Sequence, residues 1–196
     1  MAALTTSASA TPPFGQARRV GLVLAFVWLA ASPGVAPGQP VTSSVPRVMA
    51  EYRIKAAFLL NFVKFIDWPA EESRSRSPLT VCVYGDDPFE SLLDRTFAGE
   101  TVNNRPLKVT RIRKWPENCD VVFIAGTERD VRNVLQQIGP GVLTVGESAS
   151  FLRDGGMINF VIDDRRVRFD ISRSALERAS VRVSSRLLGV ARTVLK

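Results

Sequence analysis

The sequence contains no histidine among its 196 residues. Histidine is the commonest general base in enzymes and a frequent metal ligand, because its pKa lies near neutral pH. Its absence excludes Ser-His-Asp and Cys-His catalysis within this chain, together with histidine-based zinc sites. Because helix caps and turns account for most acidic residues, no nucleophile–base pair is assembled. The sequence therefore predicts no enzyme, no catalytic residue, no metal site and no cofactor.

The chain also lacks an apolar run long enough to cross a bilayer, which takes about 20 residues. Its longest run is Val20–Ala31 (VGLVLAFVWLAA), preceded by Arg18-Arg19 and followed by small and turn residues. A positive segment, a short apolar segment and small residues in this order are typical of a secretory signal peptide. We expect residues 1–38 to be removed on export, with an uncleaved N-terminal anchor as the alternative.

The remaining chain is expected to form a linker at residues 39–46 and a single α/β domain at 47–196. Residues 1–38 contain two arginines and no acidic residue, so the net charge falls from +7 to +5 after cleavage. Export makes nucleic acid an unlikely partner for this positive charge, and the basic residues are spread along the chain. Solubility is the default explanation, and a membrane surface or envelope polyanions are the other two.

Strands and helices alternate through the first part of the domain. Almost continuously apolar segments predict strands at 79–85 and 119–125, and further strands are expected at 107–112 and 142–145. After the first strand, Asp87 and Glu90 are expected to form a capping box for a helix that ends near residue 97. A second helix is expected at 131–138. This alternation predicts a central, mostly parallel sheet with helices on both faces.

The stretch from 145 to 171 follows a different pattern. A short helix at 148–152 is expected to end at the glycine pair Gly155-Gly156, with a glycine at its C′ position. Alternating strands at 157–162 and 166–171 then predict an antiparallel C-terminal hairpin beside the parallel sheet. Short helices are expected at 175–179 and 186–195.

A long first helix is expected from residue 46 or 47 to about 66. Tyr52, Leu59, Val63 and Ile66 form one apolar stripe, which we expect to face the core. A second stripe begins with the charged residues Arg47, Glu51 and Lys55 and continues as Phe58, Phe62 and Phe65. These phenylalanines are either buried within the domain or form an apolar patch for dimerisation or for a partner protein.

Two smaller sets of residues are candidate sites. Cys82 and Cys119 lie in or beside expected core strands, so they form either a disulfide or two buried thiols. The second set follows the rule that open α/β sheets bind ligands at strand ends. A weak pocket is therefore expected from residues after the strands and at the glycine turn: Asp86, Glu147, Gly155, Gly156 and Asn159.

Several motifs together resemble one protein family, the YfiR/HmsC-like family (DUF4154). In chain order they are EYRIKAAFLLNFVKFIDWP (51–69), VCVYGDDPF (81–89), LTVGESASFLRDGGMINFV (143–161), RVRFDIS (166–172) and VSSRLLGVAR (183–192). The resemblance implies an α/β protein of the Gram-negative periplasm with a tendency to form a homodimer.

The resemblance also implies a function and partners. Members restrain an inner-membrane diguanylate cyclase through its periplasmic region, usually with an outer-membrane lipoprotein as the opposing partner. This restraint lowers cyclic-di-GMP and biofilm formation, and cysteines of the family can make it redox-responsive. The alternative is a periplasmic module that binds a small molecule or an envelope polymer and has no cyclase partner.

Overall fold

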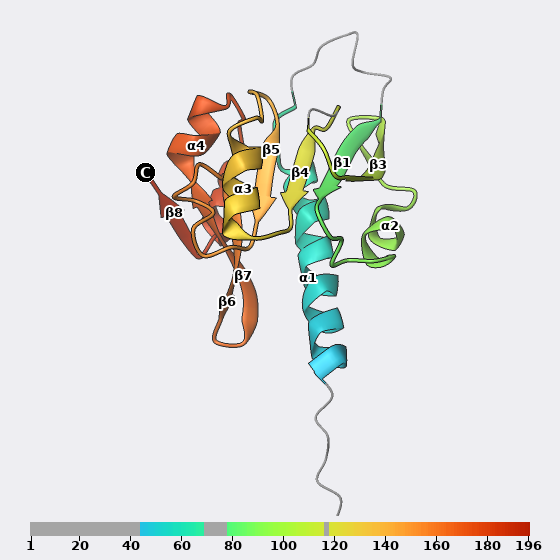
Figure 1. The fold of residues 1–196 in the computed structure, drawn as a ribbon. Coiled ribbons are helices and arrows are strands. Elements are labelled where there is room, and N and C mark those ends of the chain that lie inside the picture. The colour runs from blue at the N-terminus through green and yellow to red at the C-terminus, as the bar shows by residue number, and fades with distance from the viewer. Residues whose placement is uncertain (1–43, 69–77, 116–117) are drawn as a thin grey trace, which may run out of the picture. The chain divides into compact units, whose positions relative to one another are not determined.

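The computed structural model describes residues 44–68, 78–115 and 118–196. The predicted signal peptide and most of the predicted linker lie outside these ranges. The first helix, α1 (Ser44–Lys64), begins inside the segment predicted as linker. The other helices follow in chain order (Figure 1): α2 (Leu92–Phe97), α3 (Glu128–Leu135), α4 (Arg173–Arg178) and α5 (Ser185–Val190).

The strands form one sheet in the order β2-β3-β1-β4-β5-β6-β7-β8. Strands β3, β1, β4, β5 and β6 pair in parallel, β6 and β7 form the antiparallel hairpin, and β8 pairs in parallel with β7. Their bounds are β1 (Leu79–Tyr84), β2 (Thr101–Val102), β3 (Arg105–Ile112), β4 (Val121–Ile124), β5 (Leu143–Gly146), β6 (Ile158–Asp163), β7 (Arg166–Ser172) and β8 (Thr193–Leu195). The predicted fold class is confirmed.

Both faces of the sheet are covered, because successive side chains of a strand point to opposite faces. In β1, Val81 and Val83 lie in the larger core cluster, which also contains Leu59 and Phe62 of α1. Cys82 lies between them in the chain and belongs to a second cluster, which contains Val131 and Val134 of α3. The sheet is therefore buried on two sides, which explains the continuously apolar sequence of β1 and β4.

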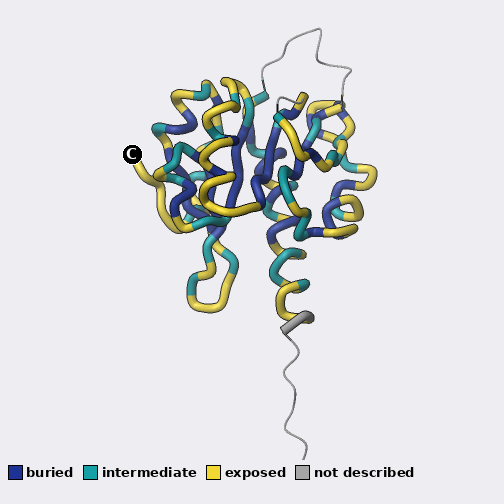
Figure 2. Tube along the Cα trace, in the orientation of Figure 1, coloured by how far each residue is buried: buried dark blue, intermediate teal, exposed yellow. Residues whose placement is uncertain are grey.

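Helix α1 lies in two environments along its length. In its second half, Ala56, Leu59, Phe62 and Val63 have no exposed surface. Its first half extends past the end of the sheet, beside the hairpin of β6 and β7 (Figure 1), and its residues are mostly exposed (Figure 2). The apolar stripe predicted to face the core is confirmed at Leu59, Val63 and Ile66.

The segment 148–152 contains turns and no α-helix, so this prediction is wrong. The chain makes a single helical turn that ends in a Schellman motif, in which Gly156 N–H donates to Phe151 C=O and Gly155 N–H to Leu152 C=O. Gly155 has a φ of +105°, which identifies it as the predicted C′ glycine. Gly146 and Gly156 lie on either side of the Phe151 ring, where a Cβ atom would approach ring carbons to within 2.3 Å.

Two further predictions are corrected at helix ends. The predicted capping box does not form: Asp87 accepts a hydrogen bond from the Phe89 N–H, Glu90 has a φ of +51°, and α2 begins only at Leu92. The predicted last helix stops at Val190, and residues 193–195 instead form the edge strand β8. Arg192 holds this strand in place with two hydrogen bonds to Asp170 of β7, since Asp170 is a buried carboxylate that requires a partner.

Candidate functional site

A groove of about 440 Å³ separates the first half of α1 from the hairpin strand β6. Glu51, Tyr52 and Lys55 line it from the helix, and the chain from Asn159 to Ile162 lines it from the strand. Glu147 and Ala149, which follow β5, complete the lining. Three separate parts of the sequence therefore meet at this end of the sheet.

Charged and aromatic side chains hold the inner part of the groove together. The Lys55 side chain is only 4% exposed, and its ammonium group pairs with Glu51 and, at 2.5 Å, with Glu147. The Tyr52 hydroxyl donates a 2.9 Å hydrogen bond to Glu147, and its ring lies 4.4 Å from the Lys55 nitrogen. Burial, followed by the nearby Glu147 carboxylate, raises the pKa of Tyr52. Two carboxylates surround one ammonium group, so the cluster carries a charge of −1.

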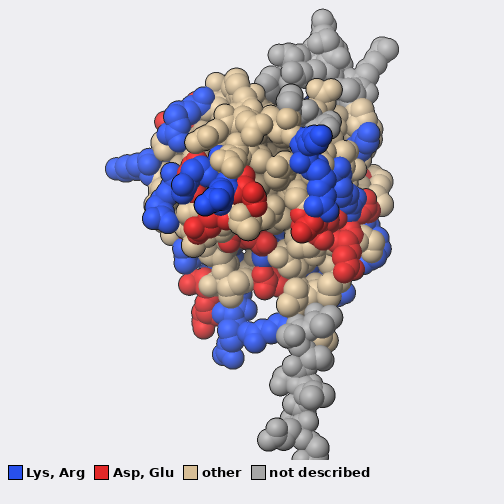
Figure 3. Space-filling model, viewed as in Figure 1, with Lys and Arg blue, Asp and Glu red and all other residues tan. Residues whose placement is uncertain are grey.

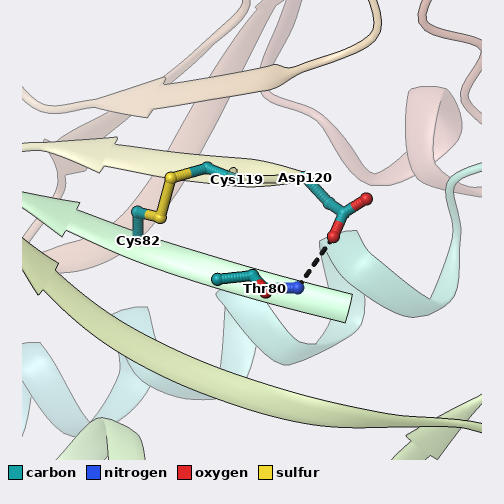
Figure 4. Close-up of a disulfide and its surroundings, with 4 residues drawn as sticks. All are labelled: Thr80, Cys82, Cys119 and Asp120. Atoms are coloured by element: carbon teal, nitrogen blue, oxygen red, sulfur yellow. Dashed lines mark hydrogen bonds between the residues drawn. A yellow bond between two sulfur atoms is a disulfide. The ribbon is translucent and has the colours of Figure 1, made fainter. Parts of the chain in front are cut away.

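Cys82 and Cys119 form a disulfide between β1 and the segment that leads into β4 (Figure 4). Their Cα atoms lie 5.9 Å apart, because β1 and β4 are neighbours in the sheet. Beside the disulfide, two hydrogen bonds join Thr80 and Asp120. The Asp120 N–H donates to the Thr80 C=O, and the Asp120 carboxylate accepts from the Thr80 N–H at 2.8 Å. The disulfide and these hydrogen bonds fix the register at the amino ends of the two central strands.

The phenylalanine stripe of α1 does not form one exposed apolar patch. Phe62 has no exposed surface and packs against Phe160 and Phe169, with ring centroids 5.6 and 4.9 Å away. Phe58 and Phe65 are half-buried and pack against the same core. Phe62, predicted as an interface candidate, is therefore a core residue, because the sheet and hairpin cover this side of the helix. Dimer formation itself stays a prediction.

The residues predicted to form a weak pocket are not brought together. Glu147 and Asn159 line the groove, whereas Asp86 lines a different hollow and forms an exposed ion pair with Arg113 at 2.7 Å. Gly155 lines a third hollow near α3 and α4, and Gly156 contacts Phe151. Strand β4 lies between β1 and β5, so the loops that follow β1 and β5 do not meet.

The side chain of Asn159 faces away from α1. Its neighbour Phe160 stacks on Phe62 of that helix, so strand alternation places Asn159 on the opposite face of the sheet. Its Oδ1 atom is buried and has no hydrogen-bond partner within the described protein. The contribution of Asn159 to the groove is therefore limited to its backbone.

Sequence reasoning missed Tyr52 and Lys55 as groove residues. The sequence places Lys55 in the charged second stripe, four residues after Glu51 and at the spacing of a helical ion pair. The structure buries Lys55 because Glu147, 92 residues further along the chain, supplies a second carboxylate. A glutamate directly after an apolar strand was the available signal, but the sequence did not indicate which helix it would meet.

Across residues 44–68, 78–115 and 118–196, no three His, Cys, Asp or Glu side chains gather as metal ligands do. None of the helices in these same ranges combines the length and hydropathy of a bilayer-spanning segment.

The fold and the groove define a disulfide-containing α/β domain whose charged groove residues pair with one another. The chain belongs to the YfiR/HmsC-like family (DUF4154), whose family model matches residues 52–192. Members of this family are periplasmic regulators of the cyclic-di-GMP system.

Two solved structures are similar in fold. One is a conserved domain protein from Vibrio cholerae O1 biovar El Tor strain N16961, 11% identical, with a TM-score of 0.48. The other is an ABC domain in complex with L-Trp from Streptococcus pneumoniae, 10% identical, with a TM-score of 0.49. The similarity covers 73% and 71% of this chain and 60% of each structure. A search of curated proteins found no match.

Proposed function

We propose that this protein is a periplasmic regulator that binds an inner-membrane diguanylate cyclase through the cyclase's periplasmic region and restrains its activity. The observation that carries the proposal is the family match, which extends over nearly the whole described domain, from residue 52 to residue 192. Such a regulator acts by binding one conformation of the cyclase better than another, which shifts the cyclase towards its less active state.

The groove supports a role in binding. Its charged groups, Glu51, Lys55 and Glu147, neutralise one another in part and are fixed by hydrogen bonds. A catalytic acid or base is instead placed to exchange protons with a substrate. The surface around this cluster is therefore better suited to contact than to proton transfer.

The test is a deletion and complementation experiment in the native bacterium. Deleting the gene is expected to raise intracellular cyclic-di-GMP and biofilm mass, and expression of the full chain is expected to restore both. Site-specific cross-linking in the periplasm then identifies the cyclase. If cyclic-di-GMP stays unchanged after deletion and no cyclase is cross-linked, the proposal is contradicted.

Export is part of the same proposal. The apolar run Val20–Ala31 after Arg18-Arg19 is expected to act as a cleaved signal peptide. N-terminal sequencing of protein from the periplasmic fraction is expected to find a mature chain that begins near residue 37 or 39. Recovery of the intact N-terminus in the membrane fraction would support the anchor alternative.

Three further elements extend the proposal. An outer-membrane lipoprotein is expected to compete with the cyclase, and the protein is expected to be a homodimer by analytical ultracentrifugation.

The Cys82–Cys119 disulfide is expected to make cyclase binding sensitive to reducing agents, because its loss loosens the central strands. Equal cyclase binding in oxidising and reducing buffer would contradict this redox response.

A second candidate function is a module that binds a small molecule or envelope polymer without a cyclase partner. The groove favours it, because about 440 Å³ lies within the usual range for ligand pockets, roughly 300–1,000 Å³. Mass spectrometry of the protein purified from the periplasm, combined with a thermal-shift screen, would detect such a ligand. A ligand that stabilises the protein, without any change in cyclic-di-GMP on deletion, would favour this candidate.

A further inference from the structure

The wall of the groove formed by α1 has the spacing of a single helix face. Glu51, Tyr52 and Lys55 line it, and Val48 stands one turn earlier on the same face, which completes an i, i+3, i+4, i+7 pattern. The opposite wall is β6, whose side chains alternate. Phe160 faces α1 and is buried, so Ile162, two residues later, faces the same way at the groove's outer end.

The outer end of the groove is apolar and exposed. Val48 is 47% exposed and Ile162 is 54% exposed, although most large apolar side chains of the described domain are buried. Val48 belongs to α1 and Ile162 to β6, the two elements on either side of the groove. Their exposed apolar surface is available for contact with an apolar side chain of a molecule bound in the groove.

The inner end of the groove is acidic. Lys55 already pairs with both carboxylates, and the Glu51 and Glu147 side chains remain 30% and 28% exposed. Their unfilled lone pairs can accept further hydrogen bonds, and the net charge of −1 favours a cation. A lysine or arginine side chain supplies both the positive charge and the donors.

The arginines of the hairpin do not oppose this charge preference. Arg166 and Arg168 alternate with Val167 and Phe169, and Phe169 packs against α1. Arg166 and Arg168 therefore face away from α1, on the other side of the hairpin. On the face shown in Figure 3, basic and acidic side chains both lie over the hairpin.

The length of the groove indicates a peptide segment as its occupant. From Val48 to Lys55 the helix rises by about 10 Å, which corresponds to about three residues of an extended chain. An occupant that reaches both the apolar and the acidic end must carry an apolar side chain and a basic side chain at that separation. A chain segment supplies both groups in a fixed order.

We propose that this groove binds a segment of the cyclase's periplasmic region in which a lysine or arginine stands about three residues from an apolar side chain. The basic side chain pairs with Glu51 and Glu147, and the apolar one lies between Val48 and Ile162. This inference rests on the proposed function and adds to it the place and the chemistry of the contact.

The experiment is calorimetric titration of the purified periplasmic region of the cyclase into the mature protein and four variants. Ile162→Ser changes the apolar end, and Glu147→Gln changes the acidic end at nearly constant shape. Their matched controls are Val190→Ser, at a residue that is 59% exposed on α5, and Glu177→Gln, at an exposed residue of α4. Circular dichroism of each variant establishes that it is folded.

We expect each groove variant to raise the dissociation constant at least about tenfold, as truncation of a central contact residue does. Each control is expected to stay within about twofold of the unmodified protein, since surface substitutions outside an interface have small effects. Glu147→Gln should also weaken the dependence of affinity on salt, because one ionic contact is lost. Ile162→Ser tests the groove independently if Glu147→Gln proves unstable.

The outcomes separate this inference from the proposed function. If the unmodified protein does not bind the cyclase, the proposed function fails. If it binds and the folded groove variants bind equally well, the groove inference is wrong and the function stands. If Ile162→Ser instead abolishes self-association in ultracentrifugation while cyclase binding is unchanged, the groove belongs to a dimer interface and the inference is likewise overturned.

Discussion

The centre of the sheet and the end where α1 meets the hairpin are built in opposite ways. At the centre, Val83 and Phe123 have no exposed surface, and a disulfide joins β1 to the start of β4. At the other end, Val48 and Ile162 are about half exposed. Helix α1 belongs to both regions, because Phe62 lies in the core and Val48 lies about four turns away, near the helix start beside the groove.

This difference separates stability from recognition within one small domain. Buried apolar surface at the centre supplies most of the favourable free energy of folding. Exposed apolar surface at the groove contributes little to folding and is available for a partner. Substitutions at the centre should therefore change stability most, and substitutions at the groove should change binding most.

The largest effect is expected for Phe62→Ala. Phe62 is fully buried and packs against three other rings, and truncation of such a side chain to alanine typically lowers the unfolding free energy by about 3–5 kcal/mol. Urea denaturation followed by circular dichroism measures this cost, with Val48→Ala on the same helix as the control. A loss below about 1 kcal/mol would mean that α1 is not anchored as the structure shows.

Removal of the disulfide comes next. In the chain-entropy model, a cross-link between residues 37 positions apart stabilises the folded state by about 3–4 kcal/mol. The double variant Cys82→Ala/Cys119→Ala should lose about this much in urea denaturation under oxidising conditions. The unmodified protein in reducing buffer is the control and should approach the variant. If the double variant and the oxidised protein were equally stable, the disulfide would not stabilise the folded state.

A smaller loss is expected for Gly146→Ala. The added Cβ would lie 2.3 Å from carbons of the Phe151 ring, which is fully buried and closed on its other side by Gly156. Overpacking of this kind typically costs about 1–3 kcal/mol. Gly139→Ala is the matched control, because its Cβ would meet no atom within 4 Å. Thermal denaturation compares the two variants. Equal melting temperatures would show that Gly146 is not packed tightly against the Phe151 ring.

A pH dependence is expected from Tyr52 at the groove. Burial and Glu147 raise its pKa, so the folded state holds the phenolic proton at a pH where the unfolded chain has released it. The stability that this group contributes is therefore fully present below the pKa of tyrosine in the unfolded chain, about 10, and is lost as the pH rises above that pKa. Tyr52→Phe should flatten the fall in stability above pH 10, as measured by urea denaturation at several pH values. If the unfolding free energies of Tyr52→Phe and of the unmodified protein fell in parallel above pH 10, Tyr52 would not be the cause of the fall.

The smallest effect on stability is expected for Ile162→Ser. Its side chain is 54% exposed, and substitutions at such surface positions usually change stability by no more than about 0.5 kcal/mol. Urea denaturation beside Val190→Ser, which is similarly exposed, provides the comparison. A loss several times larger than for Val190→Ser would show that Ile162 supports the fold and would break the proposed division between the two regions.

The sheet could be predicted from the sequence because its signals are local. Apolar runs such as 79–84, separated by helical segments, indicate buried parallel strands, and Val167, Phe169 and Ile171 alternate as a half-buried strand does. The same pattern places Cys82 and Cys119 in or beside core strands, which makes a disulfide between them a candidate. The sequence does not decide between a disulfide and two buried thiols, because strand order depends on contacts between residues that are distant in the sequence.

The groove could not be predicted, because each of its walls has an ordinary local explanation. Glu51 and Lys55 have the spacing of an exposed ion pair, and only the arrival of Glu147 from β5 makes Lys55 buried. The prediction of a helix through residue 195 is wrong for a similar reason. Its apolar residues fit a helical spacing, but pairing with β7 and the ion pair from Arg192 to Asp170 convert residues 193–195 into a strand. Tertiary contacts outweighed local propensity in both places.

The most direct test of the division between the two regions is hydrogen exchange of the protein with and without the periplasmic region of the cyclase. We expect added protection in residues 51–55 and 159–162, which line the groove. Residues 79–84 and 121–124 in the central strands should be slow in both samples, because they open only with global unfolding. Protection confined to the edge strand β8 and helix α5, with none at the groove walls, would contradict the account.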